Sequence, residues 1–94
     1  MEPTVEGFVD FVRREAKKDP KREINHHSTA TCAIGEYEKH CGLNPTSDYT
    51  VERLFAREAP EISIALCRST TEEVEKRFPT YGKLNAWLGK LKSI

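Results

Sequence analysis

The stretch 25–43 carries the signals of one complete helix, and it constrains the fold more than any other part of the chain. It contains all three histidines and two of the three cysteines. Ser28 or Thr29 can cap the start of a helix, and Gly42 can end it in a left-handed conformation. Between these ends, apolar residues recur at helical spacing: Cys32, Ala33, Ile34, Tyr37 and Cys41. We therefore predict a central core helix over residues 30–41.

Gly35 is the residue within this predicted helix that disfavours helix formation. Glycine in a helix interior costs roughly 0.5–1 kcal/mol relative to alanine. We therefore expect a close approach at Gly35, where another helix crosses, and the helix that carries Trp87 is the candidate.

Prolines and capping residues divide the rest of the chain into further short helices. Four threonines mark the expected starts: Thr4, Thr50, Thr70 and Thr80. Thr70 also forms a capping box with Glu73. Three prolines end or interrupt these helices: Pro20, Pro60 and Pro79. In the connector 20–28, Ile24 is the large apolar residue that we expect to enter the core.

The segment 60–67 is ambiguous. Ile62, Ile64 and Leu66 alternate as in a strand, whereas Pro60 suits the first position of a helix. We find no partner strand in the sequence, and an isolated strand leaves its backbone groups unpaired. A helix is therefore favoured. The whole chain is predicted to be all-α, a small single-domain bundle of five or six short helices spanning 1–94.

Composition limits the classes of function. Fifteen bases balance fifteen acids, so the whole chain has no electrostatic preference for nucleic acid or membrane. No apolar run approaches the roughly 18 residues of a membrane helix. The acidic N-terminus lacks the apolar stretch of a signal peptide. We expect an intracellular, cytoplasmic protein with reduced thiols.

A zinc site, a cysteine nucleophile and a helix-turn-helix are the candidate chemistries. The possible zinc ligands are His26, His27, Cys32, Glu36, His40 and Cys41. Structural zinc sites use close ligand pairs such as Cys-x2-Cys, and no such pair exists here. We expect no metal and no cofactor, with the cysteines as small core residues and the histidines as polar connectors.

Cys32 falls near a helix N-terminus, where the helix dipole lowers a thiol pKa. A nucleophile also needs an oriented base, and the place of Cys32 on the apolar face favours a buried, inert thiol. A helix-turn-helix over residues 36–54 has a connection, 43–49, longer than the usual 3–4 residues. Trp87 could be an interface aromatic. Its apolar stripe with Leu84, Leu88 and Leu91 favours core packing.

A locally basic segment, 13–23, holds six bases and three acids, a local charge of +3. Its bases are Arg13, Arg14, Lys17, Lys18, Lys21 and Arg22. One interpretation is a solvated helix end. The other is a partner-binding surface that faces acidic groups, acting mainly through association rate and specificity.

Two motifs resemble a recurrent pattern in small proteins of phages and prophages. The first is Asn25-His26-His27 followed by Cys32-Ala33-Ile34-Gly35-Glu36-Tyr37. The second is Thr80-Tyr81-Gly82-Lys83-Leu84-Asn85-Ala86-Trp87-Leu88. The resemblance covers about three quarters of the chain and implies a fold and a phage-like setting, without catalytic residues. By size and setting alone, such proteins are often inhibitors of bacterial defence, including anti-CRISPR proteins.

The leading hypothesis is therefore a non-enzymatic protein that binds and inhibits a host protein or ribonucleoprotein complex. A small nucleic-acid-binding regulator is the alternative, and a zinc- or thiol-dependent enzyme is less favoured. No membrane partner is expected. The sequence leaves the oligomeric state open.

Overall fold

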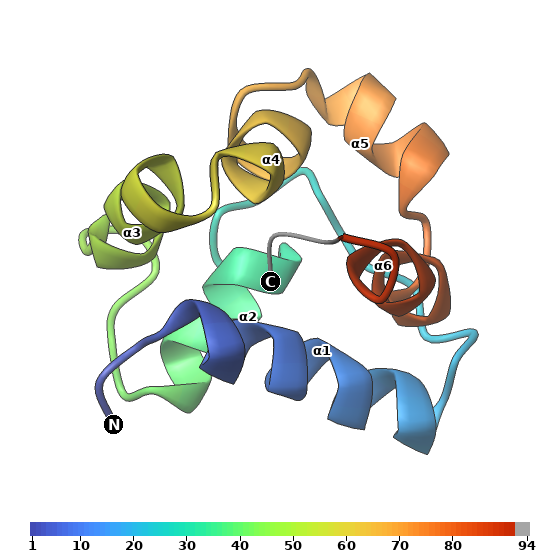
Figure 1. Ribbon diagram of the computed structural model, residues 1–94, viewed down its shortest axis with the longest axis horizontal. Coiled ribbons are helices and arrows are strands. Elements are labelled where there is room, and N and C mark those ends of the chain that lie inside the picture. The colour runs from blue at the N-terminus through green and yellow to red at the C-terminus, as the bar shows by residue number, and fades with distance from the viewer. Residues whose placement is uncertain (92–94) are drawn as a thin grey trace.

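The computed structural model describes residues 1–91 and confirms the predicted small all-α bundle (Figure 1). Its helices are α1 (Val5–Lys18), α2 (Ala33–His40), α3 (Thr50–Glu58), α4 (Pro60–Ile62), α5 (Thr71–Arg77) and α6 (Tyr81–Leu88). A π-helical turn, η1 (Ser63–Cys67), continues α4. The described molecule is nearly isometric, with principal extents of 27 × 27 × 26 Å.

Helix α1 begins and ends where the sequence predicts. Thr4 accepts a hydrogen bond through Oγ1 from the Gly7 N–H at 2.8 Å, which caps the first turn. Asp19 ends the helix, because the residue before Pro20 avoids the helical conformation. The apolar stripe of α1 is buried against the other helices through Phe8, Phe11, Val12 and Ala16.

Helix α2 starts three residues later than predicted. Cys32 is its cap, since the Cys32 Sγ accepts from the Gly35 N–H at 3.4 Å. Ser28 instead closes a separate turn, in which its carbonyl accepts from the N–H groups of Thr31 and Cys32. The predicted cap at Ser28 or Thr29 is therefore wrong.

The end of α2 is as predicted. Gly42 adopts φ +84°, and the N–H of Leu43 donates to the carbonyl of Glu38 at 2.9 Å. This is the glycine-terminated helix end in which the following backbone folds back onto the last turn.

The close approach at Gly35 exists, but no helix makes it. A Cβ at Gly35 would overlap the carbonyl oxygen of Thr29 and lie 3.1 Å from the carbonyl carbon of Ala30. The turn before α2 therefore packs on the helix itself, and the predicted crossing by another helix is wrong. Trp87 lies elsewhere, half-buried against Phe78 with ring centroids 5.0 Å apart.

The segment 60–67 is helical, which confirms the favoured interpretation. The exposed fractions of the three alternating apolar residues do not follow the pattern of a strand with one buried face. Ile62 is fully buried, Ile64 is 57% exposed and Leu66 is half-buried. The π-helical turn that follows α4 turns Ala65 into the core and leaves Ile64 in solvent.

A short connection joins the end of α1 to the start of α6. Ile24 is 6% exposed, as predicted, and its N–H donates to the carbonyl of Pro79 at 3.0 Å. In the opposite direction, the N–H groups of Tyr81 and Gly82 donate to the carbonyls of Arg22 and Pro20, both at 3.0 Å. These backbone hydrogen bonds fix the start of α6 next to the end of α1, and α6 packs along α1 (Figure 1).

Aromatic rings fill the centre of the bundle. Phe8 of α1 meets Tyr37 of α2 at 5.7 Å and Phe55 of α3 at 5.0 Å between ring centroids, both edge to face. Such pairs contribute beyond their buried area. Tyr37 also bonds the N-terminal segment, because its hydroxyl accepts from the Thr4 N–H at 3.0 Å.

Candidate functional site

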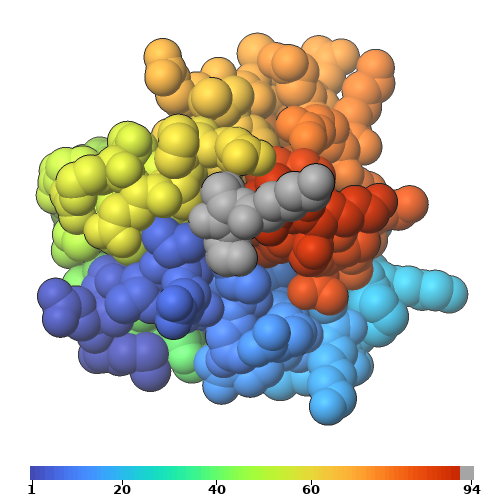
Figure 2. Space-filling view, in the orientation of Figure 1, coloured from blue at the N-terminus to red at the C-terminus, as the bar shows by residue number. Residues whose placement is uncertain are grey.

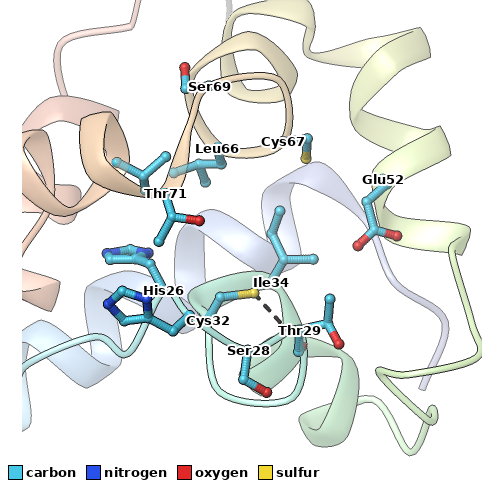
Figure 3. Close-up of a pocket in the computed structure, with 12 residues that line it drawn as sticks. His26, Ser28, Thr29, Cys32, Ile34, Glu52, Leu66, Cys67, Ser69 and Thr71 are labelled. Carbon is cyan, nitrogen blue, oxygen red and sulfur yellow. Dashed lines mark hydrogen bonds between the residues drawn. The ribbon is translucent and has the colours of Figure 1, made fainter.

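Two regions of the described structure carry chemistry. One is a pocket of about 320 Å³ between the connector before α2, helix α3, η1 and α5 (Figure 3). We call it the thiol–carboxyl pocket. It is lined by His26, His27, Ser28, Thr29, Cys32, Ile34, Glu52, Leu66, Cys67, Ser69, Thr71 and Val74.

The two thiols of the pocket come from distant parts of the chain. Cys32 caps α2 and Cys67 ends η1, so the π-helical turn positions the second thiol. In Figure 3, Cys32 lies at the centre, with Cys67 and Glu52 on one side and His26 on the other. Cys41, which the sequence groups with Cys32, is instead buried in the core at 5% exposure.

Both thiols stay protonated at neutral pH. Burial raises the pKa of Cys32 and outweighs the helix N–H groups of Gly35 and Ile34, which lower it. Burial, followed by the charge of Glu52, raises the pKa of Cys67 to about 12. A protonated thiol is a poor nucleophile and a poor metal ligand. These positions therefore suit packing and capping.

Two buried carboxyl groups, one of which lines the pocket, interact electrostatically. Glu52 of α3 lines the pocket, and its Oε2 is buried without a hydrogen-bond partner. Glu38 of α2 is 1% exposed, and neither of its carboxyl oxygens has a partner. Burial, then the charges of Glu52 and Asp48, raise the pKa of Glu38 to about 7. Burial raises the pKa of Glu52, and the charge of Asp48 adds to this, while a hydrogen bond from the backbone of Glu52 itself and the charge of Arg53 oppose it.

Sequence analysis missed Glu38. It stands in a polar run, residues 36–40, and reads there as part of a solvated helix end. A signal was present, because Glu38 lies one helical turn after the buried Ile34 and so shares its face. The spacing places Glu38 on the inner side of α2.

The three histidines make different contacts. A ring nitrogen of His26 lies 2.6 Å from the carbonyl oxygen of Phe78, and His27 pairs with Glu75. His40 packs on the ring of Phe11 with centroids 5.3 Å apart. Within residues 1–91, no group of three or more His, Cys, Asp or Glu side chains is arranged to hold a metal ion.

The second region is the basic end of α1 with the turn that follows it. We call it the α1 basic surface; it contains Arg13, Arg14, Lys17, Lys18, Lys21 and Arg22. All six side chains are exposed, and this part of the chain forms the lower edge of the face in Figure 2.

Four of these six bases form ion pairs with acidic neighbours. Asp10 pairs with Arg13 and Arg14, the latter through Nε at 3.0 Å. Glu15 pairs with Lys18 at 2.9 Å and with Arg22. The hydrogen bond from Lys18, followed by nearby charges, lowers the pKa of Glu15. In the described part of the chain, Lys17 and Lys21 are the bases of this surface that have no ion pair.

The residues of the two sequence motifs are engaged in the fold. Cys32 caps α2, Gly35 touches the preceding turn, and Glu36 pairs with Arg22 and Lys39. In the second motif, Thr80 Oγ1 caps α6 by accepting from the Lys83 N–H at 3.2 Å. The motifs thus account for helix ends and tight contacts.

The candidate helix-turn-helix takes a different form from a DNA-reading motif. Helix α2 ends at His40 and α3 begins at Thr50, so the connection 41–49 is longer than the usual turn. Glu52, on the would-be recognition helix, faces the thiol–carboxyl pocket. Within the described residues, no helix has the length and hydropathy needed to cross a bilayer.

Comparison of the chain with protein-family models, curated protein sequences and solved structures found no match.

Proposed function

We propose that this chain is a non-enzymatic binding protein that inhibits a larger host protein by occupying part of its surface. The proposed setting is the cytoplasm of a phage-infected bacterium. A host protein or a ribonucleoprotein complex of the anti-CRISPR-target kind is the proposed partner. The observation that carries the proposal is the α1 basic surface. Its Lys17 and Lys21 have no ion pair, while its other four bases are paired with acidic side chains.

The motif residues make contacts within the fold, which supports recognition of a partner by the α1 basic surface. Cys32, Gly35 and Thr80 each hold a helix end or a tight contact, so their chemistry is engaged within the fold. The raised pKa of Cys32 keeps its thiol in the unreactive form. Exposed groups are then the ones left to recognise a partner.

The arrangement of charges supports an acidic protein partner over a nucleic acid. Residues 10–23 contain six bases and four acids, a net charge of +2. The acids Asp10 and Glu15 lie among the bases and would face phosphates at close range. A protein partner can place acidic side chains opposite Lys17 and Lys21 and bases or donors opposite the acids.

The test begins with affinity capture from a bacterial lysate, followed by a measured affinity for the captured protein. The Lys17→Glu, Lys21→Glu double variant should bind about tenfold more weakly or worse at low salt, because two attractive contacts become repulsive. The loss should shrink at high salt, where exposed charges are screened over several ångströms.

The matched control is Arg68→Glu with Lys76→Glu. Both residues are exposed; Lys76 lies in α5 and Arg68 shortly before it, and Figure 1 shows α5 away from α1. This variant has the same change in net charge and should bind like the parent. Equal binding by the Lys17, Lys21 variant and the parent would remove the α1 basic surface from the interface.

Nucleic-acid binding is the second candidate, and the same variants distinguish it. A regulator of that kind would bind mixed-sequence DNA or RNA with an affinity that falls steeply with salt. If the parent binds such DNA and the Lys17, Lys21 variant does not, the surface contacts phosphates and the protein-inhibitor proposal is wrong.

A further inference from the structure

The thiol–carboxyl pocket has the size and lining of a ligand site. Its volume of about 320 Å³ lies at the lower end of the range for small-molecule pockets, roughly 300–1,000 Å³. One side is apolar, formed by Ile34, Leu66 and Val74. The two protonated thiols of Cys32 and Cys67 extend this apolar lining. An aliphatic chain would find contacts on this side.

The lining also includes one acidic side chain, Glu52. The Oε2 of Glu52 is buried and accepts no hydrogen bond, and both carboxyl oxygens of Glu38, on which the charge of Glu52 acts, are also without a partner. Among residues 1–91, neither carboxyl is in an ion pair with a base. Buried carboxylates without a cation or donor are costly in free energy, so a cationic ligand would remove a cost already present in the fold.

The charged groups around this pair are few. Asp48, before α3, adds negative charge near both carboxyls, and Arg53 is the base whose charge acts on Glu52. The rim carries His26, bonded to Phe78, and His27, paired with Glu75. The acidic groups Glu52, Glu38 and Asp48 therefore outnumber the one base, Arg53, that acts on this pair.

We propose that the thiol–carboxyl pocket binds an aliphatic cation, with the alkyl chain on Ile34, Leu66 and Val74 and the charged head on the carboxylate of Glu52. The fitting chemistry is an alkylguanidinium or alkylammonium. Such a group is found on an arginine or lysine side chain of a partner protein and also in free amines. This site is separate from the α1 basic surface and does not depend on the function proposed above.

Binding of a cation is linked to loss of protons from the carboxyls. Glu38 has a pKa of about 7, so its carboxyl becomes more negative as pH rises through neutrality, and burial also raises the pKa of Glu52 above its ordinary value. Affinity for the cation should therefore increase from pH 6 to pH 8.

The test uses butylguanidinium and its neutral analogue butylurea, which have nearly the same shape. Each is titrated into the purified protein and followed by NMR at the amides of Leu66, Cys67 and Val74. Butylguanidinium should bind at least about tenfold tighter than butylurea, since a hydrogen bond to a charged group is worth more than a neutral one. The difference should grow between pH 6 and pH 8.

Two matched variants locate the charge that is recognised. Glu52→Gln keeps the shape of the side chain and should reduce the preference for butylguanidinium about tenfold. Glu58→Gln, an exposed position on the same helix, should leave it unchanged. Equal affinity for the two probes in the parent, or an unchanged preference in the Glu52→Gln variant, would overturn the proposal.

A further arm distinguishes the two sources of the cation. A capped Gly-Arg-Gly tripeptide presents the same guanidinium on a peptide backbone. Binding of the tripeptide as tightly as butylguanidinium, with the same shifted amides, assigns the pocket to a side chain of a partner protein. Binding of butylguanidinium with exclusion of the tripeptide assigns it to a free amine.

Discussion

Gly35 is a residue for which the structure makes a sharp prediction. A Cβ there would overlap the carbonyl oxygen of Thr29, which is backbone in a hydrogen-bonded turn and cannot rotate away. Gly35→Ala should therefore lower the free energy of unfolding by about 1–3 kcal/mol, although alanine is the better helix former. Urea denaturation measures this.

The control for this prediction is Gly89→Ala. The nearest atom to a Cβ at Gly89 is 3.5 Å away, an ordinary contact, and the substitution should change stability little. If Gly35→Ala is as stable as Gly89→Ala, the turn at residues 28–31 does not pack on α2 as described.

Glu38 links the stability of the fold to pH. The pKa of Glu38 rises from its ordinary value of 4.5 to about 7 in the fold, because burial and then two neighbouring carboxyls disfavour its charge. The folded state therefore binds more protons than the unfolded state between these values. Stability is highest below the unfolded pKa and falls as pH rises toward and through 7, by on the order of 2–3 kcal/mol.

The Glu38→Gln variant tests this dependence. Glutamine cannot ionise, so the difference in unfolding free energy between variant and parent should shift in favour of the variant from pH 5 to pH 8. Glu58→Gln, which is exposed, should show no such shift. Parallel pH profiles for parent and Glu38→Gln would mean that Glu38 titrates in the fold as it does in the unfolded chain.

At the scale of helices, local signals predict most of the fold. Thr4, Thr70 and Thr80 all cap the helices expected of them, because a threonine hydroxyl bonds the free N–H groups of the first turn. Thr50 marks the right place with a different role. It is the first residue of α3, and its own N–H donates to Asp48 Oδ1 at 2.8 Å.

The parts that were not predicted depend on tertiary contacts. The start of α2 shifts because a thiol, an uncommon cap, accepts the bond from Gly35 while the serine upstream closes its own turn. The π-helical turn at η1 has no local signature, since helical and strand patterns both fit residues 60–67. Packing of Ile62 and Ala65 into the core decides between them.

The thiol–carboxyl pocket could not be predicted from the sequence either, because it also depends on tertiary contacts. Its lining comes from the connector before α2, from α2, α3, η1 and α5, and no spacing along the chain brings Cys32 beside Cys67. The α1 basic surface, by contrast, is continuous in sequence and was found. Which of its bases form ion pairs with Asp10 and Glu15 could not be predicted from the sequence. Those pairs leave Lys17 and Lys21 as the bases of this surface without an ion pair.

At the scale of the whole molecule, the connection between residues 20–24 and 79–82 joins the end of α1 to the start of α6. It consists of backbone hydrogen bonds from Ile24, Tyr81 and Gly82, and an isolated antiparallel bridge pairs Glu23 with Thr80. Gly82 is required by this closeness, since a Cβ there would lie 2.6 Å from the Pro20 carbonyl oxygen. The connection therefore forms only when α1 and α6 are both in place.

Hydrogen exchange of these amides tests whether the molecule opens as one unit. The amide of Ile24 lies outside any helix, yet it should exchange as slowly as the amide of Val12 in α1, through global unfolding. Leu84→Ala, a cavity in α6, should destabilise the protein by about 2–5 kcal/mol and speed exchange at Ile24 and Val12 by the same factor. The amide of Ala30, in an exposed turn, should exchange fast in both proteins. Faster exchange at Ile24 that Leu84→Ala leaves unchanged would show that the connection opens locally while α1 stays folded.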